Sequence, residues 1–75
     1  MNESAFEGLK GRKLSVMLKR NKPNGEPETY IVILDCCKDG YVILDYNSPS
    51  YKPKDNPIDK MIISIDEIKS IWVYK

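Results

Sequence analysis

Hydrophobic and polar residues alternate along several short segments of this chain, as they do in half-buried β-strands. Leu14, Val16 and Leu18, for example, alternate with more polar residues, so one face of that segment is apolar. Comparable segments follow, separated by residues that favour turns. The pattern predicts strands at about residues 13–19, 28–37, 41–46, 60–65 and 69–75.

Turn-forming residues separate these segments. Residues 21–27 read Asn-Lys-Pro-Asn-Gly-Glu-Pro and predict a hairpin loop, because asparagine and glycine accept positive φ. Lys38-Asp39-Gly40 predicts a tight reversal of the Asp-Gly kind. Residues 47–60 contain three prolines and predict a longer loop.

Two short helical segments are expected around the strands. Ser4 and Glu7 have the spacing of a helix capping box, and Gly11 is a suitable terminator, so a helix is predicted at about residues 4–10. Asp66-Glu67 predicts one helical turn before the last strand, with Ile68 filling the core.

The second strand is apolar on both faces over residues 30–34. Both faces must then be covered, or the strand must bend through a barrel wall. The fold class that follows is mainly β: one domain spanning residues 1–75, built as a five-stranded, strongly bent antiparallel barrel with a short N-terminal helix.

Composition and charge set weak limits on function. The 75 residues are 41% hydrophobic and 31% charged, with a net charge of +1, as in an ordinary soluble domain. Residues 1–22 carry six basic and two acidic side chains, whereas residues 23–75 carry six basic and nine acidic ones. The front of the chain is therefore mildly basic.

No stretch resembles a signal peptide or a membrane span. Residues 1–11 contain acidic groups and no apolar run, and no apolar segment approaches the roughly 18 residues that a span needs. We expect a cytoplasmic protein without membrane association.

Two adjacent cysteines, Cys36 and Cys37, precede the tight turn. Neighbouring strand residues point to opposite faces, and cysteine metal sites need further soft ligands, whereas this chain contains no other cysteine and no histidine. We expect two reduced cysteines that act as small hydrophobic residues, no metal and no cofactor; a redox or intermolecular role is the alternative.

Acidic residues gather around the same turn. Asp35 and Asp45 are equidistant from Gly40, so they are expected to face each other across the hairpin, with Asp39 nearby. Paired carboxylates can transfer protons or hold a divalent cation, but a solvated strand face is the favoured interpretation. Without histidine or an activated nucleophile, the sequence predicts a protein that is not an enzyme.

The order of elements resembles a known superfamily. Residues 9–16, Leu-Lys-Gly-Arg-Lys-Leu-Ser-Val, are similar to the helix-to-first-strand run of the Sm-like superfamily of small SH3-like barrels, and residues 65–71, Ile-Asp-Glu-Ile-Lys-Ser-Ile, are similar to its last turn and strand. This superfamily includes the bacterial RNA chaperone that acts as host factor for phage Q-beta. The resemblance covers roughly residues 5–74 and implies an Sm-like or SH3-like barrel.

The family's base-binding motif is altered here. Its Asp corresponds to Asp39, and Tyr41 supplies a ring that can stack, but Ile43 stands where the family has an amide. Ile63-Ser64 stands in place of an Arg-Gly pair. The resemblance therefore implies RNA binding with a degraded uridine pocket.

Two functions are compatible with this sequence. One is a non-catalytic protein-interaction and assembly module. The other is weak, sequence-poor binding of RNA, for which basic side chains supply phosphate contacts and exposed rings supply stacking. The residues expected to bind nucleic acid are Lys10, Arg12, Lys13, Lys19, Arg20, Asp39 and Tyr41.

Self-association is expected because the last two strands are apolar on both faces. A core this small covers one face of a strand, and an open strand edge exposes unpaired backbone groups. In the Sm-like family the corresponding strands pair between subunits and close a ring. We expect a homo-oligomer, most simply a closed ring, with Ile62, Trp72 and Tyr74 at the contact.

Overall fold

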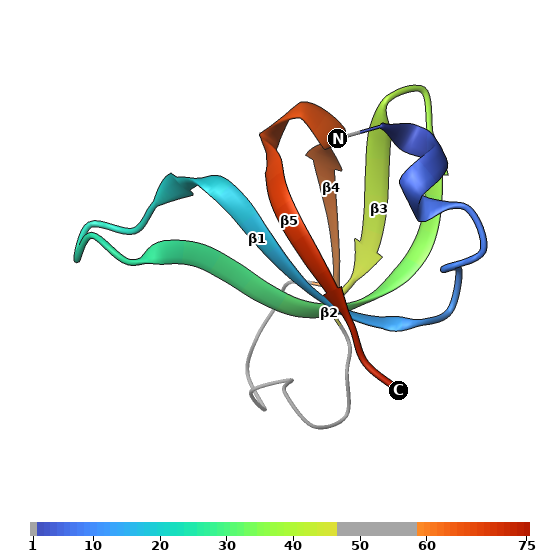
Figure 1. Cartoon of the computed structure of the whole chain (residues 1–75), viewed down its shortest axis with the longest axis horizontal. Helices are drawn as coiled ribbons and strands as arrows, with labels where there is room; N and C mark the ends of the chain where they lie inside the picture. The colour runs from blue at the N-terminus through green and yellow to red at the C-terminus, as the bar shows by residue number, and fades with distance from the viewer. Residues whose placement is uncertain (1, 47–58) are drawn as a thin grey trace.

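In the computed structural model, which describes residues 2–46 and 59–75, five antiparallel strands form one sheet. The strands are β1 (Lys13–Asn21), β2 (Pro27–Lys38), β3 (Tyr41–Asp45), β4 (Lys60–Ser64) and β5 (Ile68–Val73). Each lies within two residues of the segment predicted for it. The structure therefore confirms a mainly β fold of antiparallel strands (Figure 1).

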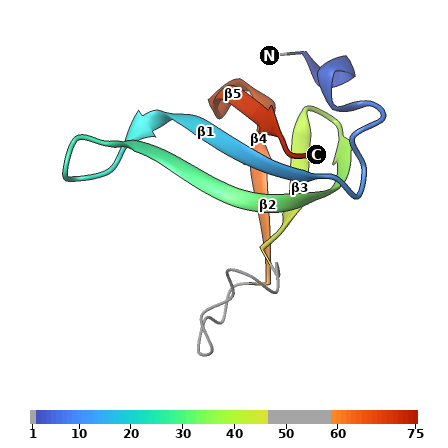
Figure 2. The same ribbon diagram turned by 60° about the horizontal axis from the view of Figure 1, so that its bottom comes forward.

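The order of the strands across the sheet is β4-β3-β2-β1-β5. The first and last strands in this order, β4 and β5, are the two edges of the sheet. They follow each other in the chain, joined by the three-residue 3₁₀ turn η2 (Ile65–Glu67). The sheet curves strongly, and the β1–β2 hairpin extends beyond the rest of the molecule (Figure 2).

The helix expected at residues 4–10 is replaced by a single 3₁₀ turn, η1 (Glu3–Phe6). The capping-box prediction is wrong, because the cap is Asn2, whose Oδ1 accepts a hydrogen bond from the Ser4 backbone N–H at 3.2 Å. Glu7 already has extended backbone (φ −64°, ψ 136°), so the turn ends after Phe6. Gly8 then adopts φ 81°, a left-handed conformation that suits glycine.

The two hairpins contain the turns that the sequence predicts. In the β2–β3 hairpin, Asp39 (φ 53°) and Gly40 (φ 82°) form a two-residue loop, and such loops need positive φ at both positions. In the β1–β2 hairpin, the Lys22 N–H donates to Glu26 O at 2.8 Å. The loop predicted at residues 47–60 lies almost wholly outside the described residues.

One face of the sheet, here called the core face, encloses the hydrophobic core. Leucine and valine side chains from β1, β2 and β3 point inward at alternate positions, and Ile68 fills the core as predicted. The opposite face is called the outer face. The buried residues are Phe6, Leu14, Val16, Leu18, Val32, Leu34, Val42, Leu44, Ile65 and Ile68.

Phe6 anchors the N-terminal segment to this core, since only 2% of its surface is exposed. We expect Phe6→Ala to lower the free energy of unfolding by about 3 kcal/mol, because it removes a buried aromatic ring and leaves a cavity. That loss is close to the whole stability of a chain this small. Urea unfolding monitored by circular dichroism measures it.

The matched control is Ala5→Ser, an exposed position in the same 3₁₀ turn. Its effect should stay within about 0.5 kcal/mol. Equal midpoints for the two variants would show that η1 does not contribute to the core in solution.

Candidate functional site

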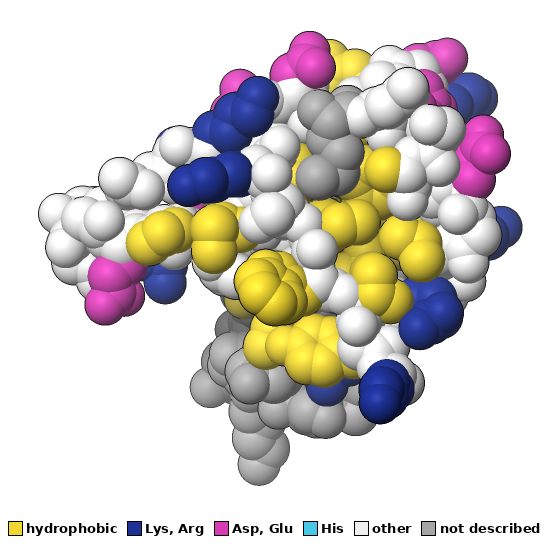
Figure 3. Space-filling view, viewed as in Figure 1, with side chains coloured by type: hydrophobic (Ala, Val, Ile, Leu, Met, Phe, Trp, Pro, Cys, Tyr) yellow, Lys and Arg dark blue, Asp and Glu magenta, His cyan; other side chains and the backbone are white. Residues whose placement is uncertain are grey.

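Large hydrophobic side chains are exposed at the two sheet edges. Ile62 on β4 and Trp72 on β5 are each 67% exposed, and Tyr74, just after β5, is 41% exposed. Hydrophobic side chains gather in the middle of the face shown in Figure 3. The three residues that the sequence predicts at an oligomer contact are thus all open to solvent in the single chain.

The strand register assigns these side chains to the outer face. Ile62 lies opposite Ile43, and Trp72 lies opposite Ser15. The intervening positions, Met61 and Ile71 among them, pack against the core. Each edge strand therefore presents apolar side chains on both faces, while a single core covers only one of them.

Two basic side chains hold the residue that follows β5. The Arg12 guanidinium donates from Nη2 to the Tyr74 carbonyl at 3.0 Å, and the Lys13 ammonium lies 5.0 Å from the centre of the Tyr74 ring. A cation over an aromatic face is stabilised by the quadrupole of the ring. These two predicted phosphate ligands therefore contribute to keeping the end of β5 beside β1.

Acidic side chains surround Lys60 at the start of β4. Its Nζ donates to Asp35 Oδ2 at 2.7 Å, and this contact lowers the pKa of the Asp35 carboxyl. The charges of Asp45 and Asp59 also act on Lys60 and contribute to raising its pKa. This end of the β4 edge is therefore acidic, whereas the end of β5 near Arg12 and Lys13 is basic.

The expected pairing of Asp35 with Asp45 is wrong. The hairpin closes through a two-residue loop, and the register shifts between Leu34 and Cys36, so that Asp35 is the extra residue of a β-bulge. Asp45 lies opposite Ile33 instead. Within residues 2–46 and 59–75, no three cysteine, aspartate or glutamate side chains are arranged to hold a metal ion.

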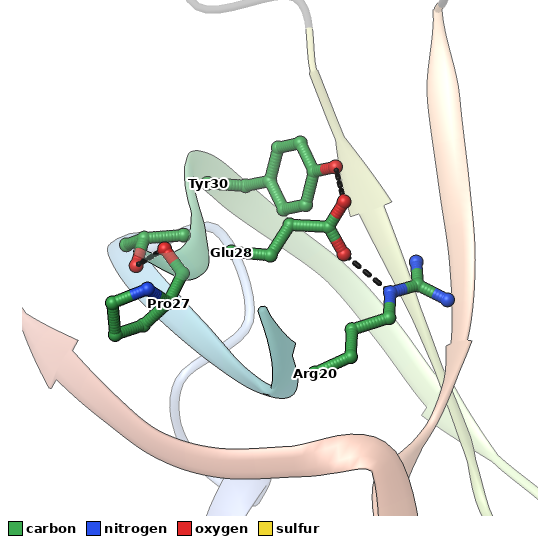
Figure 4. Close-up of polar contacts among 5 residues, drawn as sticks. Arg20, Pro27, Glu28 and Tyr30 are labelled. Atoms are coloured by element: carbon green, nitrogen blue, oxygen red, sulfur yellow. Dashed lines mark hydrogen bonds and ion pairs between the residues drawn. The ribbon is translucent and has the colours of Figure 1, made fainter. Parts of the chain in front are cut away.

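A second polar cluster joins the base of the β1–β2 hairpin to the core (Figure 4). Glu28 accepts from Arg20 Nε through one carboxylate oxygen, and from the Tyr30 hydroxyl, at 2.9 Å, through the other. The Tyr30 ring in turn packs edge-on against Tyr46, with ring centres 6.0 Å apart. Arg20, another predicted phosphate ligand, is thus engaged in an ion pair.

The predicted nucleic-acid residues do not form one site. Lys10, Arg12 and Lys13 lie around the start of β1, whereas Lys19 and Arg20 lie toward its other end. Asp39 and Tyr41 lie at a third location, the β2–β3 turn, where Tyr41 is 51% exposed.

Both cysteines are free thiols. Cys36 pairs with the outward Ile43 and Cys37 with the buried Val42, as strand alternation predicts. Both border a surface cleft of about 500 Å³ between β2 and the N-terminal segment. Burial, with the Glu3 carboxylate, raises the pKa of the Cys37 thiol, which disfavours the nucleophilic thiolate.

Sequence reasoning missed the roles of Glu28 and Lys60. A signal for Glu28 is its position: it lies eight residues from Arg20, across a hairpin loop that the sequence does predict. Lys60 contacts Asp35 across β3, and this contact depends on the bulge, for which the sequence contains no signal.

Neither short helix in the described residues is long enough to cross a bilayer.

Comparison of the chain with protein-family models, curated proteins and solved structures gave no match.

Hydrogen bonds from Arg20 and Tyr30, together with the charge of Arg20, lower the pKa of Glu28 below the ordinary glutamate value of 4.5. A carboxyl whose pKa is lowered on folding stabilises the fold above its unfolded pKa, and this contribution is lost as pH falls through the folded value. We expect Glu28→Gln to have a lower melting temperature than the natural chain at pH 7. The difference between the two melting temperatures should shrink as the pH falls below the ordinary glutamate pKa of 4.5.

Thermal melts followed by circular dichroism across this range measure the difference. Glu26→Gln, an exposed change in the same hairpin loop, is the control and should melt close to the natural chain. A Glu28→Gln difference that stays constant into acid would contradict a stabilising role for the ionised carboxylate.

Proposed function

We propose that this chain is a non-catalytic protein-interaction and assembly module that associates with copies of itself. The observation that carries the proposal is the exposure of Ile62, Trp72 and Tyr74 at the two open edges of one sheet. Soluble monomers rarely leave large apolar patches exposed, and they usually cover or blunt the unpaired edges of a sheet.

The arrangement of strands supports a small barrel of the SH3-like or Sm-like type. β1 pairs with both β2 and β5, so the sheet curls until its first and last elements approach each other. The η2 turn joins the two edge strands through three residues, which holds them near each other at that end. A small barrel of five short strands would protect a core with few residues.

The energetic gain from covering the edges is substantial for so small a chain. Full burial of a large apolar side chain contributes about 1.5–3 kcal/mol, and Ile62 and Trp72 are both two-thirds exposed. New backbone hydrogen bonds between edge strands would add to this gain. Because the two edges are different surfaces, contact between them is heterologous, and a closed ring is the assembly that leaves no edge free.

RNA binding is the weaker proposal. Arg12 and Lys13 are engaged with Tyr74, and Arg20 with Glu28, so three of the five basic candidates already have partners. The predicted base-stacking ring, Tyr41, lies opposite Lys38 on β2 and Ser64 on β4, whereas these three contacts involve residues of β1 or next to it. This distribution favours separate structural contacts over one positively charged surface that tracks a nucleic-acid backbone.

We expect the natural chain to be oligomeric at tens of micromolar and the double variant Ile62→Ser with Trp72→Ser to be monomeric, because the change removes the exposed apolar groups from both edges. Light scattering after size-exclusion chromatography measures both masses. The matched control is Tyr41→Ser, a large exposed residue on the interior strand β3, which should stay oligomeric. A monomeric natural chain would overturn self-association.

We expect no nucleic acid to co-purify with the chain, and any affinity for single-stranded RNA to be micromolar or weaker. Such binding should fall steeply with salt, since only phosphate contacts would support it, and Arg12→Glu with Lys13→Glu should abolish it. Fluorescence anisotropy at low and high salt measures this, with Lys69→Glu, which changes a basic residue outside the predicted set by the same charge, as a control. Tight binding indifferent to salt would favour the RNA function instead.

A further inference from the structure

The loop of the β1–β2 hairpin contains an asparagine directly before a glycine, Asn24 and Gly25. Residues 22–26 are exposed throughout, and the hairpin projects beyond the rest of the molecule (Figure 2). A Cβ built on Gly25 would meet no atom within 4 Å other than those of its chain neighbours. Solvent therefore reaches the peptide bond that joins the two residues.

An asparagine followed by an accessible backbone nitrogen can react with its own main chain. The nitrogen of the next residue adds to the side-chain carbonyl carbon, a five-membered succinimide ring closes, and ammonia leaves. Water then opens the ring at one of its two carbonyls and gives aspartate or isoaspartate. Water is the only co-reactant that this sequence of steps consumes.

Glycine is the residue that hinders this attack least. Gly25 has no Cβ to shield its nitrogen, and its φ of 88° lies in a region that glycine enters at no steric cost. The other asparagines of the described residues lack such a neighbour, since Asn2 precedes Glu3 and Asn21 precedes Lys22. Asn21 is also paired within the β1–β2 ladder. The loop thus separates one asparagine from the others by both sequence and structure.

One hydrogen bond in the loop favours the addition step. The Asn24 Oδ1 atom accepts from the Glu26 N–H at 3.0 Å. Negative charge develops on this oxygen when a nitrogen adds to the carbonyl carbon, and a backbone N–H already directed at the oxygen stabilises that charge. The side-chain carbonyl of Asn24 is therefore polarised before the reaction begins.

A second hydrogen bond opposes the attack. The Gly25 N–H donates to Lys22 O at 2.9 Å, so the attacking nitrogen must first leave this partner. Water replaces a lost partner at small net cost in an exposed loop, and loop tips are among the segments that open most readily. The Arg20–Glu28 ion pair at the base of the hairpin keeps this opening local.

We propose that Asn24 is a site of spontaneous deamidation, with the backbone nitrogen of Gly25 as the attacking group. The new bond joins Gly25 N to Asn24 Cγ, the Cγ–Nδ2 bond breaks, and the proton of the attacking nitrogen leaves with the ammonia. A carboxylate replaces a neutral amide, so the formal net charge falls from +1 to zero. This inference is independent of self-association, because Asn24 lies on neither edge strand.

The two products change the loop differently. Aspartate keeps an oxygen that can accept from the Glu26 N–H, and this acceptor is now charged, which strengthens the hydrogen bond. Isoaspartate adds one carbon to the backbone between residues 24 and 25, which displaces Gly25 from Lys22. Either product places a negative charge in the loop beside a basic residue.

Ageing of the natural chain at mildly alkaline pH, followed by peptide mapping with mass spectrometry, tests the site. We expect the mass gain of an amide converted to a carboxylate to accumulate at Asn24, with Asn2 and Asn21 largely unchanged. Enzymatic methyl transfer to isoaspartate identifies the succinimide route, since direct hydrolysis of the amide by water gives aspartate alone.

The matched variant is Gly25→Ala, because an added Cβ has open space there yet shields the nitrogen. It should lose most of the modification while Asn24 itself is retained. A variant that deamidates as fast as the natural chain would overturn the role of Gly25, and so would aspartate without isoaspartate. Equal reaction at Asn21, or an unmodified Asn24, would overturn the site. The comparison among asparagines of the natural chain holds whether or not the variant folds.

Discussion

The pairing of β1 with β5 is the interaction on which the rest of the structure depends. It brings together segments at opposite ends of the chain, and the Arg12–Tyr74 hydrogen bond joins residues 62 positions apart. Through it, Leu14 and Val16 are buried against β5, the sheet curls, and Trp72 is directed to the outer face. Without this pairing, β1 would itself be an edge, and the core would lose the side that Ile68 closes.

A chain of this length forms one core, and that limit explains its exposed surface. In the part of the chain that the structure describes, ten hydrophobic residues are buried in the core, yet β4 and β5 carry apolar side chains on both faces. Fewer residues bury a smaller fraction of their surface, and among residues 2–46 and 59–75 the outer apolar side chains Ile62 and Trp72 stay two-thirds exposed. Their location on the two edge strands, where backbone groups are also unpaired, connects the thin core to the proposed role in assembly.

Small irregularities determine where the charged groups lie. The bulge at Asp35 removes that carboxylate from the hairpin ladder and directs it to Lys60 across β3. Toward the end of β1, Glu28 binds Arg20 and also accepts a hydrogen bond from the Tyr30 hydroxyl, and these contacts hold the projecting hairpin to the body. Three of the basic side chains near the front of the chain are thus engaged at two separate places, Arg12 and Lys13 at Tyr74 and Arg20 at Glu28.

Much of the fold could be predicted from the sequence alone, because the alternation of Leu14, Val16 and Leu18 and the Asp39-Gly40 turn are local signals that short-range sterics and solvent enforce. The exposure of Ile62, Trp72 and Tyr74 was anticipated for a similar reason: their strands have more apolar positions than one core can cover. The tertiary structure alone decided the contacts of Asp35, Lys60, Arg20 and Arg12. These depend on strand register and on residues distant in the chain, and a bulge of one residue is enough to change which side chains meet. The local pattern at Ser4 and Glu7 also failed to identify the cap, since the Asn2 side chain accepts from the Ser4 N–H and the chain is already extended at Glu7.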